Sequence, residues 1–190
     1  MNFLVIFSQL LSLILIEDRK NRMQRQEEKV FKKILDDNKY SIYRICRIYT
    51  VPPVEAQDLF QEVVFQIWKS LPNFKEKSNV STWVYKIALN VCTRSKNQLK
   101  KGNIDTVKLE SVEFKSSDFI PDTDQNEKYN ALHDCISALE ESDQSLVILY
   151  LEDLSYKKMA EITGLTENHI AVKIKRMRKK LLNCITSKLK

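Results

Sequence analysis

The stretch DLFQEVVFQIWKSLPNFKEKSNVSTWVYKIALNVC, residues 58–92, has the pattern of two amphipathic helices with a break between them. Apolar residues recur every three or four positions in its first half, which places them on one face of a helix. These residues are Leu59, Phe60, Val63, Val64, Ile67, Trp68 and Leu71. Pro72 and Asn73 end this helix, and we expect Ser81 to cap the second one. The stretch therefore predicts two helices that pack through their apolar faces.

The polar faces of these two helices indicate different partners. The first helix turns Asp58, Gln61 and Glu62 away from its apolar side, which indicates a surface that docks on another protein. The predicted buried stripe of the second helix consists of Val84, Ile87, Ala88, Val91 and Cys92. The residues outside that stripe are Trp83, Tyr85, Lys86, Asn90 and Arg94. This second face suits single-stranded nucleic acid, because bases stack on aromatic rings and phosphates meet cations.

The composition favours helices and excludes most kinds of enzyme site. The 190 residues include only 2 Gly and 4 Pro, with a net charge of +6 that is compatible with a polyanionic partner. We find no Gly-rich phosphate loop, no metal-ligand cluster and no nucleophile with a base at a recognisable spacing. The sequence thus predicts no enzyme, no catalytic residue, no cofactor and no metal site. Cys46, Cys92, Cys135 and Cys184 form no CxxC pair, so we expect free buried thiols in a reducing cytoplasm.

The first 22 residues form an apolar extension. Residues 3–16 contain no charged side chain, but they are too few to span a bilayer securely, and no signal-peptide features accompany them. Three explanations remain open: a start site placed too far upstream, a weak membrane-associating or partner-binding helix, or an extra core helix. We expect the first, with Met23 as the true first residue, because a continuous soluble pattern begins there.

The rest of the chain divides into two helical domains and a linker. Apolar periodicity over residues 23–100, broken at Pro52 and Pro53, predicts an antiparallel helical bundle, the N-terminal domain. Residues 101–126 lose this periodicity and are predicted to be a flexible acidic linker. Between Gly102 and Asn126 the acidic residues are Asp105, Glu110, Glu113, Asp118, Asp122 and Asp124, against Lys108 and Lys115. Residues 127–190 form the C-terminal domain, so the predicted fold class is all-α, with two small helical domains joined by a flexible linker.

The C-terminal domain has the pattern of a helix-turn-helix. Ser155 can cap a short helix, Gly164 supplies a tight turn, and Thr166 can cap a longer basic helix. We expect the two helices to be held together by Ala160, Leu165, Ile170 and Ile174. The longer helix would lie in the major groove of DNA with its N-terminal residues nearest the bases. The basic residues from position 173 onward supply phosphate affinity.

Together these two blocks resemble the extracytoplasmic-function (ECF) sigma factors, the small members of the bacterial sigma-70 family. The matching residues of region two are Asp58, Gln61, Glu62, Ile67, Trp68, Leu71, Pro72, Phe74, Thr82, Trp83, Tyr85, Ile87, Ala88 and Asn90. Those of region four are Leu139, Leu154, Ser155, Tyr156, Ala160, Glu161, Ile162, Gly164 and Leu165. The resemblance covers about residues 27–190. It implies a cytoplasmic promoter-recognition subunit of RNA polymerase, with region two in residues 23–100 and region four in residues 127–190.

The resemblance implies a role for each matching surface. Asp58, Gln61 and Glu62 correspond to the surface that docks on the clamp helices of the polymerase beta-prime subunit. The residues that correspond to capture of a flipped base and the melted strand of the minus-ten element are Phe74, Lys75, Asn79, Thr82, Trp83, Tyr85, Lys86 and Asn90. A preformed stacking surface favours melting because extruding a base is costly. The acidic linker corresponds to the segment that leads toward the RNA exit channel.

Region four corresponds to the reader of the minus-thirty-five element. Its matching contact residues are Ser155, Tyr156, Asn168, His169, Ala171, Val172, Lys173, Lys175 and Arg176. Ala171 and Val172 depart from the family, which usually has a basic residue and a small hydroxyl residue there. Apolar contact with thymine methyl groups is therefore expected at these positions, and bidentate readout of guanine is not.

The implied partners are core RNA polymerase, through its beta-prime clamp and its beta subunit, and promoter DNA. The family commonly also has an anti-sigma factor, and the resemblance implies no small-molecule substrate and only an indirect relation to the membrane. One alternative stays open: a helix-turn-helix transcription regulator that is not a polymerase subunit. It would explain the C-terminal domain but neither the docking face at Asp58, Gln61 and Glu62 nor the aromatic face at Trp83 and Tyr85. A membrane-tethered regulator would depend wholly on the first 16 residues.

Overall fold

The computed structural model describes residues 3–74, 79–101 and 123–189, and within them it is built of helices with no named strand. The elements are α1 (Phe3–Tyr49), α2 (Ala56–Ser70), the 3-10 turn η1 (Leu71–Asn73), α3 (Val80–Lys100), α4 (Thr123–Ser137), α5 (Glu141–Leu151), α6 (Tyr156–Thr163) and α7 (Glu167–Lys188). Side chains are described for residues 25–74, 79–101 and 127–189. The all-α prediction is confirmed. Lys75 and residues 102–122 of the predicted linker lie outside the described residues.

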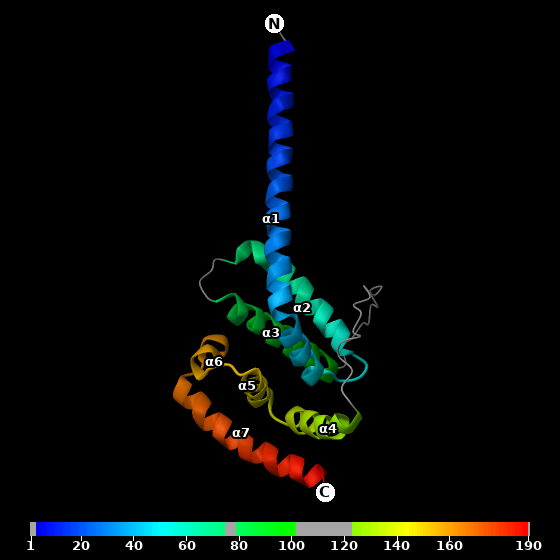
Figure 1. Cartoon of the computed structure of the whole chain (residues 1–190), viewed down its shortest axis with the longest axis vertical. Helices are drawn as coiled ribbons and strands as arrows, with labels where there is room; N and C mark the ends of the chain where they lie inside the picture. The colour runs from blue at the N-terminus through cyan, green and yellow to red at the C-terminus, as the bar shows by residue number, and fades with distance from the viewer. Residues whose placement is uncertain (1–2, 75–78, 102–122, 190) are drawn as a thin grey trace.

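The N-terminal domain packs the second half of α1 against α2 and α3 (Figure 1). The predicted apolar stripes of α2 and α3 meet α1, because the side chains at their centres are fully buried. These central residues are Ile42, Ile45 and Cys46 of α1, Val63 and Ile67 of α2, and Val84, Ala88 and Cys92 of α3. The stretch 58–92 therefore forms the helix pair that its periodicity predicts.

The apolar extension at the N-terminus is part of α1 in the structure. The helix begins at Phe3, and its first half runs away from the body of the molecule (Figure 1). Within the described residues, no helix is long and apolar enough to cross a membrane. The three explanations for this extension remain predictions, because side chains before Arg25 are not described.

The start of α3 differs in one detail from the sequence prediction. The sequence predicts Ser81 as the cap, but Asn79 is the capping residue, and its Oδ1 accepts a hydrogen bond from the Ser81 backbone N–H at 2.9 Å. Asn is as good a cap as Ser, and the backbone at Asn79 is still outside the helix, with a ψ of 137°. Ser81 therefore lies in the first turn of α3.

The C-terminal domain contains the predicted helix-turn-helix, formed by α6 and α7. The hydroxyl of Ser155 caps α6 by accepting from the Lys158 N–H, and that of Thr166 caps α7 by accepting from the His169 N–H, both at 3.3 Å. Gly164 has a φ of 76°, a left-handed conformation that glycine adopts without strain. The residues that fill the space between these helices and α5 are Leu146, Leu149, Met159, Ile162, Ile170, Ile174 and Met177. The α4 helix begins at Thr123, inside the range 101–126 that the sequence assigns to the linker.

The two domains are in contact with each other. In Figure 1, α5 and α6 lie between α3 and α7, and α6 packs on α3 while α4 packs on α1. The buried residues of both domains belong to one continuous apolar cluster. The C-terminal domain is therefore seated on the N-terminal domain, an arrangement that the sequence did not predict.

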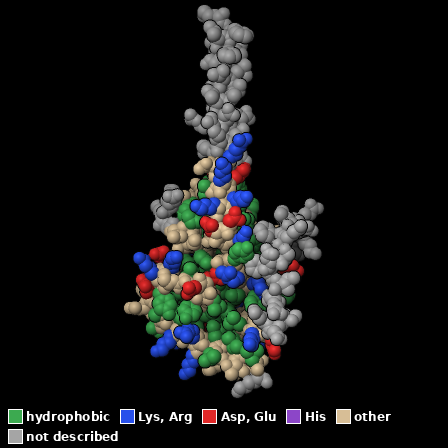
Figure 2. Space-filling model, in the orientation of Figure 1, with side chains coloured by type: hydrophobic (Ala, Val, Ile, Leu, Met, Phe, Trp, Pro, Cys, Tyr) green, Lys and Arg blue, Asp and Glu red, His purple; other side chains and the backbone are tan. Residues whose placement is uncertain are grey.

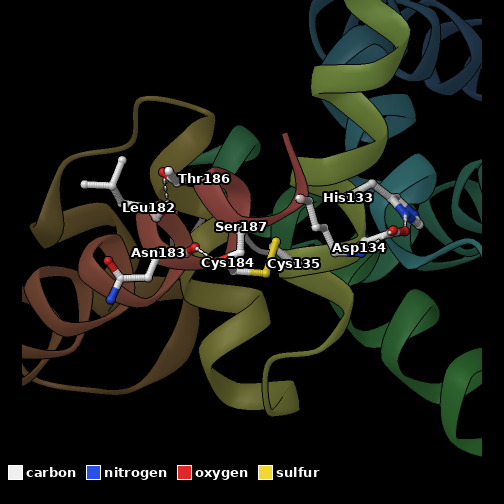
Figure 3. Close-up of a disulfide and its surroundings, with 9 residues drawn as sticks. His133, Asp134, Cys135, Leu182, Asn183, Cys184, Thr186 and Ser187 are labelled. Carbon is white, nitrogen blue, oxygen red and sulfur yellow. Dashed lines mark hydrogen bonds and ion pairs between the residues drawn. A yellow bond between two sulfur atoms is a disulfide. The ribbon is translucent and has the colours of Figure 1, made fainter. Parts of the chain in front are cut away.

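The prediction of four free thiols is wrong for two of the cysteines. Cys135 on α4 and Cys184 on α7 form a disulfide (Figure 3). These residues are 49 positions apart, but α4 packs along α7 and brings their Cα atoms to 6.0 Å, the spacing that a disulfide needs. Cys46 and Cys92 are free and buried as predicted, with their Sγ atoms 3.9 Å apart. The contact with Cys92 and burial raise the pKa of the Cys46 thiol.

Candidate nucleic-acid interface

The polar face of α2 is present on the surface of the N-terminal domain. Asp58 is exposed, and its Oδ2 accepts a hydrogen bond from the Glu55 N–H at 3.3 Å, which stabilises the start of the helix. Gln61 and Glu62 are half-buried, and Glu62 forms an ion pair with Arg94 of α3 at 3.1 Å. This face also displays Phe65, which is 55% exposed and which the sequence argument left out. Its exposure could have been predicted, because Phe65 lies outside the apolar stripe of α2.

An aromatic pair stands where η1 is followed by α3. The rings of Phe74 and Trp83 lie 4.6 Å apart between centroids, at an interplanar angle of 32°. Both residues are half-buried, and Asn79 at the start of α3 is exposed. Lys86 and Asn90 are exposed farther along α3. Ring surface, an amide and a cation therefore lie along one edge of the N-terminal domain, which is the chemistry that binds single strands.

Two of the predicted strand-binding residues, Thr82 and Tyr85, are not exposed, and the predicted exposed face of α3 is wrong at Tyr85. Tyr85 is only 7% exposed, and its hydroxyl lies 3.5 Å from Glu152 at the end of α5. Thr82 is 4% exposed, and its Oγ1 has no hydrogen-bond partner among the described residues. Burial raises the pKa of the Tyr85 phenol. For Tyr85 the physical reason is the docking of the C-terminal domain, since α6 packs on α3 and Glu152 at the α5–α6 turn reaches the Tyr85 hydroxyl.

The recognition helix α7 is largely open. Asn168, His169 and Val172 are exposed near its N-terminus, and Val172 has 58% of its surface accessible. Lys175, Arg176 and Tyr156 are also exposed, whereas Ala171 is half-buried. Figure 2 shows Lys and Arg side chains along the lower left edge of the body, where α7 lies. This distribution fits a helix that meets phosphates along its length.

Two predicted contact residues of the helix-turn-helix already have partners in the chain. The Lys173 ammonium lies 2.5 Å from the Asp143 carboxylate of α5, and both side chains are largely buried. The Ser155 hydroxyl is occupied as the cap of α6. These two residues are therefore less available to DNA than their neighbours on the same surface. Among the described residues, no group of three or more His, Cys, Asp or Glu is placed to hold a metal ion.

Two family models match the chain, one in the N-terminal domain and one in the C-terminal domain. Sigma-70 region 2 matches residues 34–101, and Sigma-70, region 4 matches residues 129–181. Together the matches cover more than half of the chain. The chain belongs to the ECF group of the sigma-70 family. Region two of this sigma factor is therefore built from the second half of α1 with α2 and α3, and region four from α4 to α7.

Similar curated proteins agree with this membership. The chain is 28% identical over 146 residues to the RNA polymerase sigma factor SigV of Bacillus subtilis, covering 75% of this chain and 82% of that protein. It is 24% identical to the ECF sigma factor SigW of the same organism, over 88% of this chain and 95% of that one. The ECF sigma-E factor of Escherichia coli is 23% identical, over 92% of this chain and 94% of that protein.

Solved structures share the fold. The sigma factor RpoE of Bartonella quintana, solved with the anti-sigma factor NepR, superposes with a TM-score of 0.61 at 21% identity, over 83% of this chain and 98% of that one. CnrH, solved with the cytosolic domain of CnrY, superposes with a TM-score of 0.63 at 14% identity, over 84% of this chain and 90% of that one. This sigma factor therefore has the all-helical fold of these two proteins.

Proposed function

We propose that the surfaces described above divide the work of a sigma factor among three helices. As a member of the family, the protein directs promoter-specific initiation of transcription by core RNA polymerase. The polar face of α2 holds the polymerase, the aromatic pair at the start of α3 holds the opened minus-ten strand, and α7 reads the minus-thirty-five element. The observation that carries this division is the pairing of Phe74 with Trp83 at the end of region two.

The docking role of α2 is supported by its exposure and charge. Asp58, Gln61 and Glu62 correspond to the family surface that docks on the beta-prime clamp helices, and none of them is needed for the apolar core. The ion pair of Glu62 with Arg94 lies at the surface, where such pairs contribute little to stability. We propose Phe65 as the apolar centre of this interface, because an exposed aromatic ring between polar neighbours is typical of binding hot spots.

The strand-holding role of α3 is supported by its rings. Phe74 and Trp83 offer a ready surface on which an extruded base can stack, and Lys86 and Asn90 offer polar contacts farther along the helix. Asn79 and Lys75 belong to the same proposed site. Thr82 and Tyr85 belong to the same proposed site, and Tyr85 takes part on the condition that region four moves away from it.

The minus-thirty-five role of α7 is supported by the exposed residues near its N-terminus. Asn168 and His169 supply polar groups to base edges, while Ala171 and Val172 supply apolar contact with thymine methyl groups. Lys175 and Arg176 meet phosphates. The protein should therefore prefer thymine to guanine at the position of the minus-thirty-five element that faces Val172.

We propose that the protein acts in the cytoplasm and has no catalytic activity of its own. Its partners are core RNA polymerase and promoter DNA, and no small-molecule substrate or cofactor enters the proposal. We also propose an anti-sigma factor as a partner, since RpoE of Bartonella quintana was solved with one. The membrane would then be involved only indirectly, through such a partner.

Binding to core polymerase tests this function against the alternative regulator. Asp58→Lys and Glu62→Lys should each weaken binding of the full chain to core polymerase at least tenfold, or about 1.4 kcal/mol, with helical content unchanged by circular dichroism. Asp37→Lys, which makes the same charge change on an exposed site of α1, is the control and should bind normally. If the chain binds duplex DNA tightly on its own and does not bind core polymerase, it is the helix-turn-helix regulator that is not a polymerase subunit.

A further inference from the structure

The disulfide of region four joins the first helix of that domain to its last one. Cys135 lies on α4 with 2% of its surface exposed, and Cys184 lies half-buried near the end of α7 (Figure 3). An ion pair between Lys188 and Asp134, at 2.8 Å, connects the same two helices beside it. Both members of this pair are exposed, and such a pair contributes little to stability. The covalent bond is therefore the stronger of these two links.

The two halves of α7 are held in different ways. In the first half, Ile174 and Met177 are buried in the core that α7 shares with α5 and α6. Beyond Met177, no described residue of α7 is buried. Three residues there are half-buried: Leu181, Cys184 and Ile185. The second half of α7 therefore depends on its bond to α4 to stay in place.

This second half carries charge that can bind phosphates. Arg178, Lys179 and Lys180 are exposed on it, and they continue the basic surface of Lys175 and Arg176. Phosphate contacts supply affinity that does not depend on base sequence and that weakens with salt. A loose helix end loses conformational entropy when it binds, whereas a helix end that is already fixed does not. The bond at Cys184 therefore affects how tightly region four binds DNA.

The surroundings of Cys184 favour its oxidation. Lys180 and Lys188 lie one turn before it and one turn after it, on the same side of α7. Lys188 is shared with Asp134. Cations close to a thiol stabilise the thiolate, which is the form that reacts with oxidants. Cys184 therefore combines partial exposure with neighbours that favour its reactive form.

The other two cysteines have the opposite surroundings. Cys46 and Cys92 are fully buried, and their Sγ atoms lie 3.9 Å apart without a bond. The contact with Cys92 and burial raise the pKa of the Cys46 thiol, which keeps it protonated and unreactive. Disulfides in cytoplasmic proteins are usually transient, and many of them sense redox state. Of the two cysteine pairs, the one in region four therefore has the position and the chemistry of a redox sensor.

We propose that Cys135 and Cys184 form a reversible redox site, which tightens the binding of region four to DNA when it is oxidised. The Cys184 thiolate attacks one oxygen of hydrogen peroxide, and the O–O bond breaks. Cys184 becomes a sulfenic acid, and the hydroxide that leaves takes a proton to become water. The Cys135 thiol then attacks the Cys184 sulfur and displaces hydroxide, which leaves as a second water with the Cys135 proton. Two electrons pass from the sulfurs to the peroxide.

A dithiol reverses this step by exchange and is itself oxidised to a disulfide. The redox site rests on the proposed function for its role in transcription, although oxidation and DNA affinity are properties of the chain alone. An oxidant would strengthen the binding of region four to the minus-thirty-five element. It would not change which bases are read, because Asn168 and His169 lie in the half of α7 that the core holds.

A redox titration of the full chain tests the chemistry of the site. Hydrogen peroxide should join Cys135 to Cys184 in the reduced chain, and mixtures of reduced and oxidised glutathione should set the bridged fraction. Alkylation of free thiols followed by peptide mass spectrometry measures that fraction. Cys46 and Cys92 should stay unbridged throughout. A bridge that glutathione and dithiothreitol leave intact would be purely structural and would overturn the redox site, as would two thiols that never pair.

Salt titrations of duplex DNA binding test the effect of the site. The slope of log affinity against log salt should be steeper by about 1 in the bridged chain than in the reduced one, because reduction loses a phosphate contact. Cys184→Ser should match the reduced chain and should not respond to peroxide. Cys46→Ala with Cys92→Ala leaves the redox site intact and is the matched control, which should respond as the parent chain does. The relative affinities for duplexes that differ at single minus-thirty-five positions should stay the same.

The two proposals fail in different ways. If bridging changes the salt slope but the chain does not bind core polymerase, the redox site stands and the proposed function is wrong. If the chain binds core polymerase but its bridged and reduced forms have the same affinity and the same slope, the proposed function stands and the redox site is wrong.

Discussion

Region two and region four present their proposed DNA contacts in opposite ways. In region four, α7 leaves Asn168, His169 and Val172 open to solvent. In region two, Tyr85 of α3 is buried and its hydroxyl lies 3.5 Å from Glu152 of region four. The helix-turn-helix surface is therefore complete within its own domain, while the strand-holding surface depends on where the other domain lies. Four experiments test this difference between the two regions.

The largest effect should come from the disulfide, which only region four has. In the chain-entropy account, a bridge that closes a loop of 49 residues stabilises a domain by about 4 kcal/mol. Cys135→Ser with Cys184→Ser should therefore lower the urea midpoint of region four and leave that of region two nearly unchanged. Dithiothreitol should reproduce the shift in the parent chain and have no effect in the variant. Equal midpoints with and without reductant would mean that the bridge does not hold α4 to α7 in solution.

The next effect concerns the aromatic pair of region two. Trp83→Ala should weaken binding of the minus-ten strand by the holoenzyme by about 1–3 kcal/mol, the usual contribution of one stacked base, and should impair strand opening more than polymerase binding. Trp68→Ala is a matched control, because Trp68 also packs on a phenylalanine, Phe31, at 4.9 Å between ring centroids, but lies on α2. Fluorescence anisotropy with a labelled minus-ten oligonucleotide measures strand binding in both variants. Equal losses in polymerase and strand binding would make Trp83 a packing residue instead.

A comparable effect on sequence preference is expected at the open end of α7. Val172→Arg introduces a guanidinium at a side chain that is 58% exposed. It should shift preference at one minus-thirty-five position from thymine toward guanine, by about 1–3 kcal/mol. Competition between duplexes that differ at single positions would detect it in the holoenzyme. A uniform change over all positions would show that residue 172 does not face a base.

The smallest effect separates two neighbouring lysines of region four. Lys175→Ala should reduce the slope of log affinity against log salt by about 1, because an exposed phosphate contact is lost. Lys173→Ala should change the slope less, because its ammonium is held by Asp143 in the free protein. Titrations of duplex DNA at several salt concentrations measure both slopes. Identical changes would show that DNA displaces Asp143 at little cost.

Local sequence signals predicted much of the fold. The caps at Ser155 and Thr166, the left-handed Gly164 and the apolar stripe of α2 all follow from residue type and spacing over a few positions. These signals work because capping and helical periodicity are interactions within one or two turns. The helix-turn-helix and its exposed face could be predicted for the same reason.

What the sequence did not predict depends on contacts between distant positions. Cys135 and Cys184 are 49 residues apart, and only the packing of α4 along α7 brings them together. Arg44 and Glu152, which pair across the two domains, are 108 residues apart, and nothing in their neighbourhoods marks them as partners. Periodicity predicts an exposed Tyr85 because it describes one helix and not the domain that covers it.

Run-off transcription shows whether this chain recognises promoters as a subunit of RNA polymerase. Core polymerase should transcribe linear genomic DNA from discrete start sites when the full chain is added, and these transcripts should be lost with Asp58→Lys and retained with Asp37→Lys. Start sites that do not depend on the chain, with core polymerase shown to be active on a nonspecific template, would contradict the account.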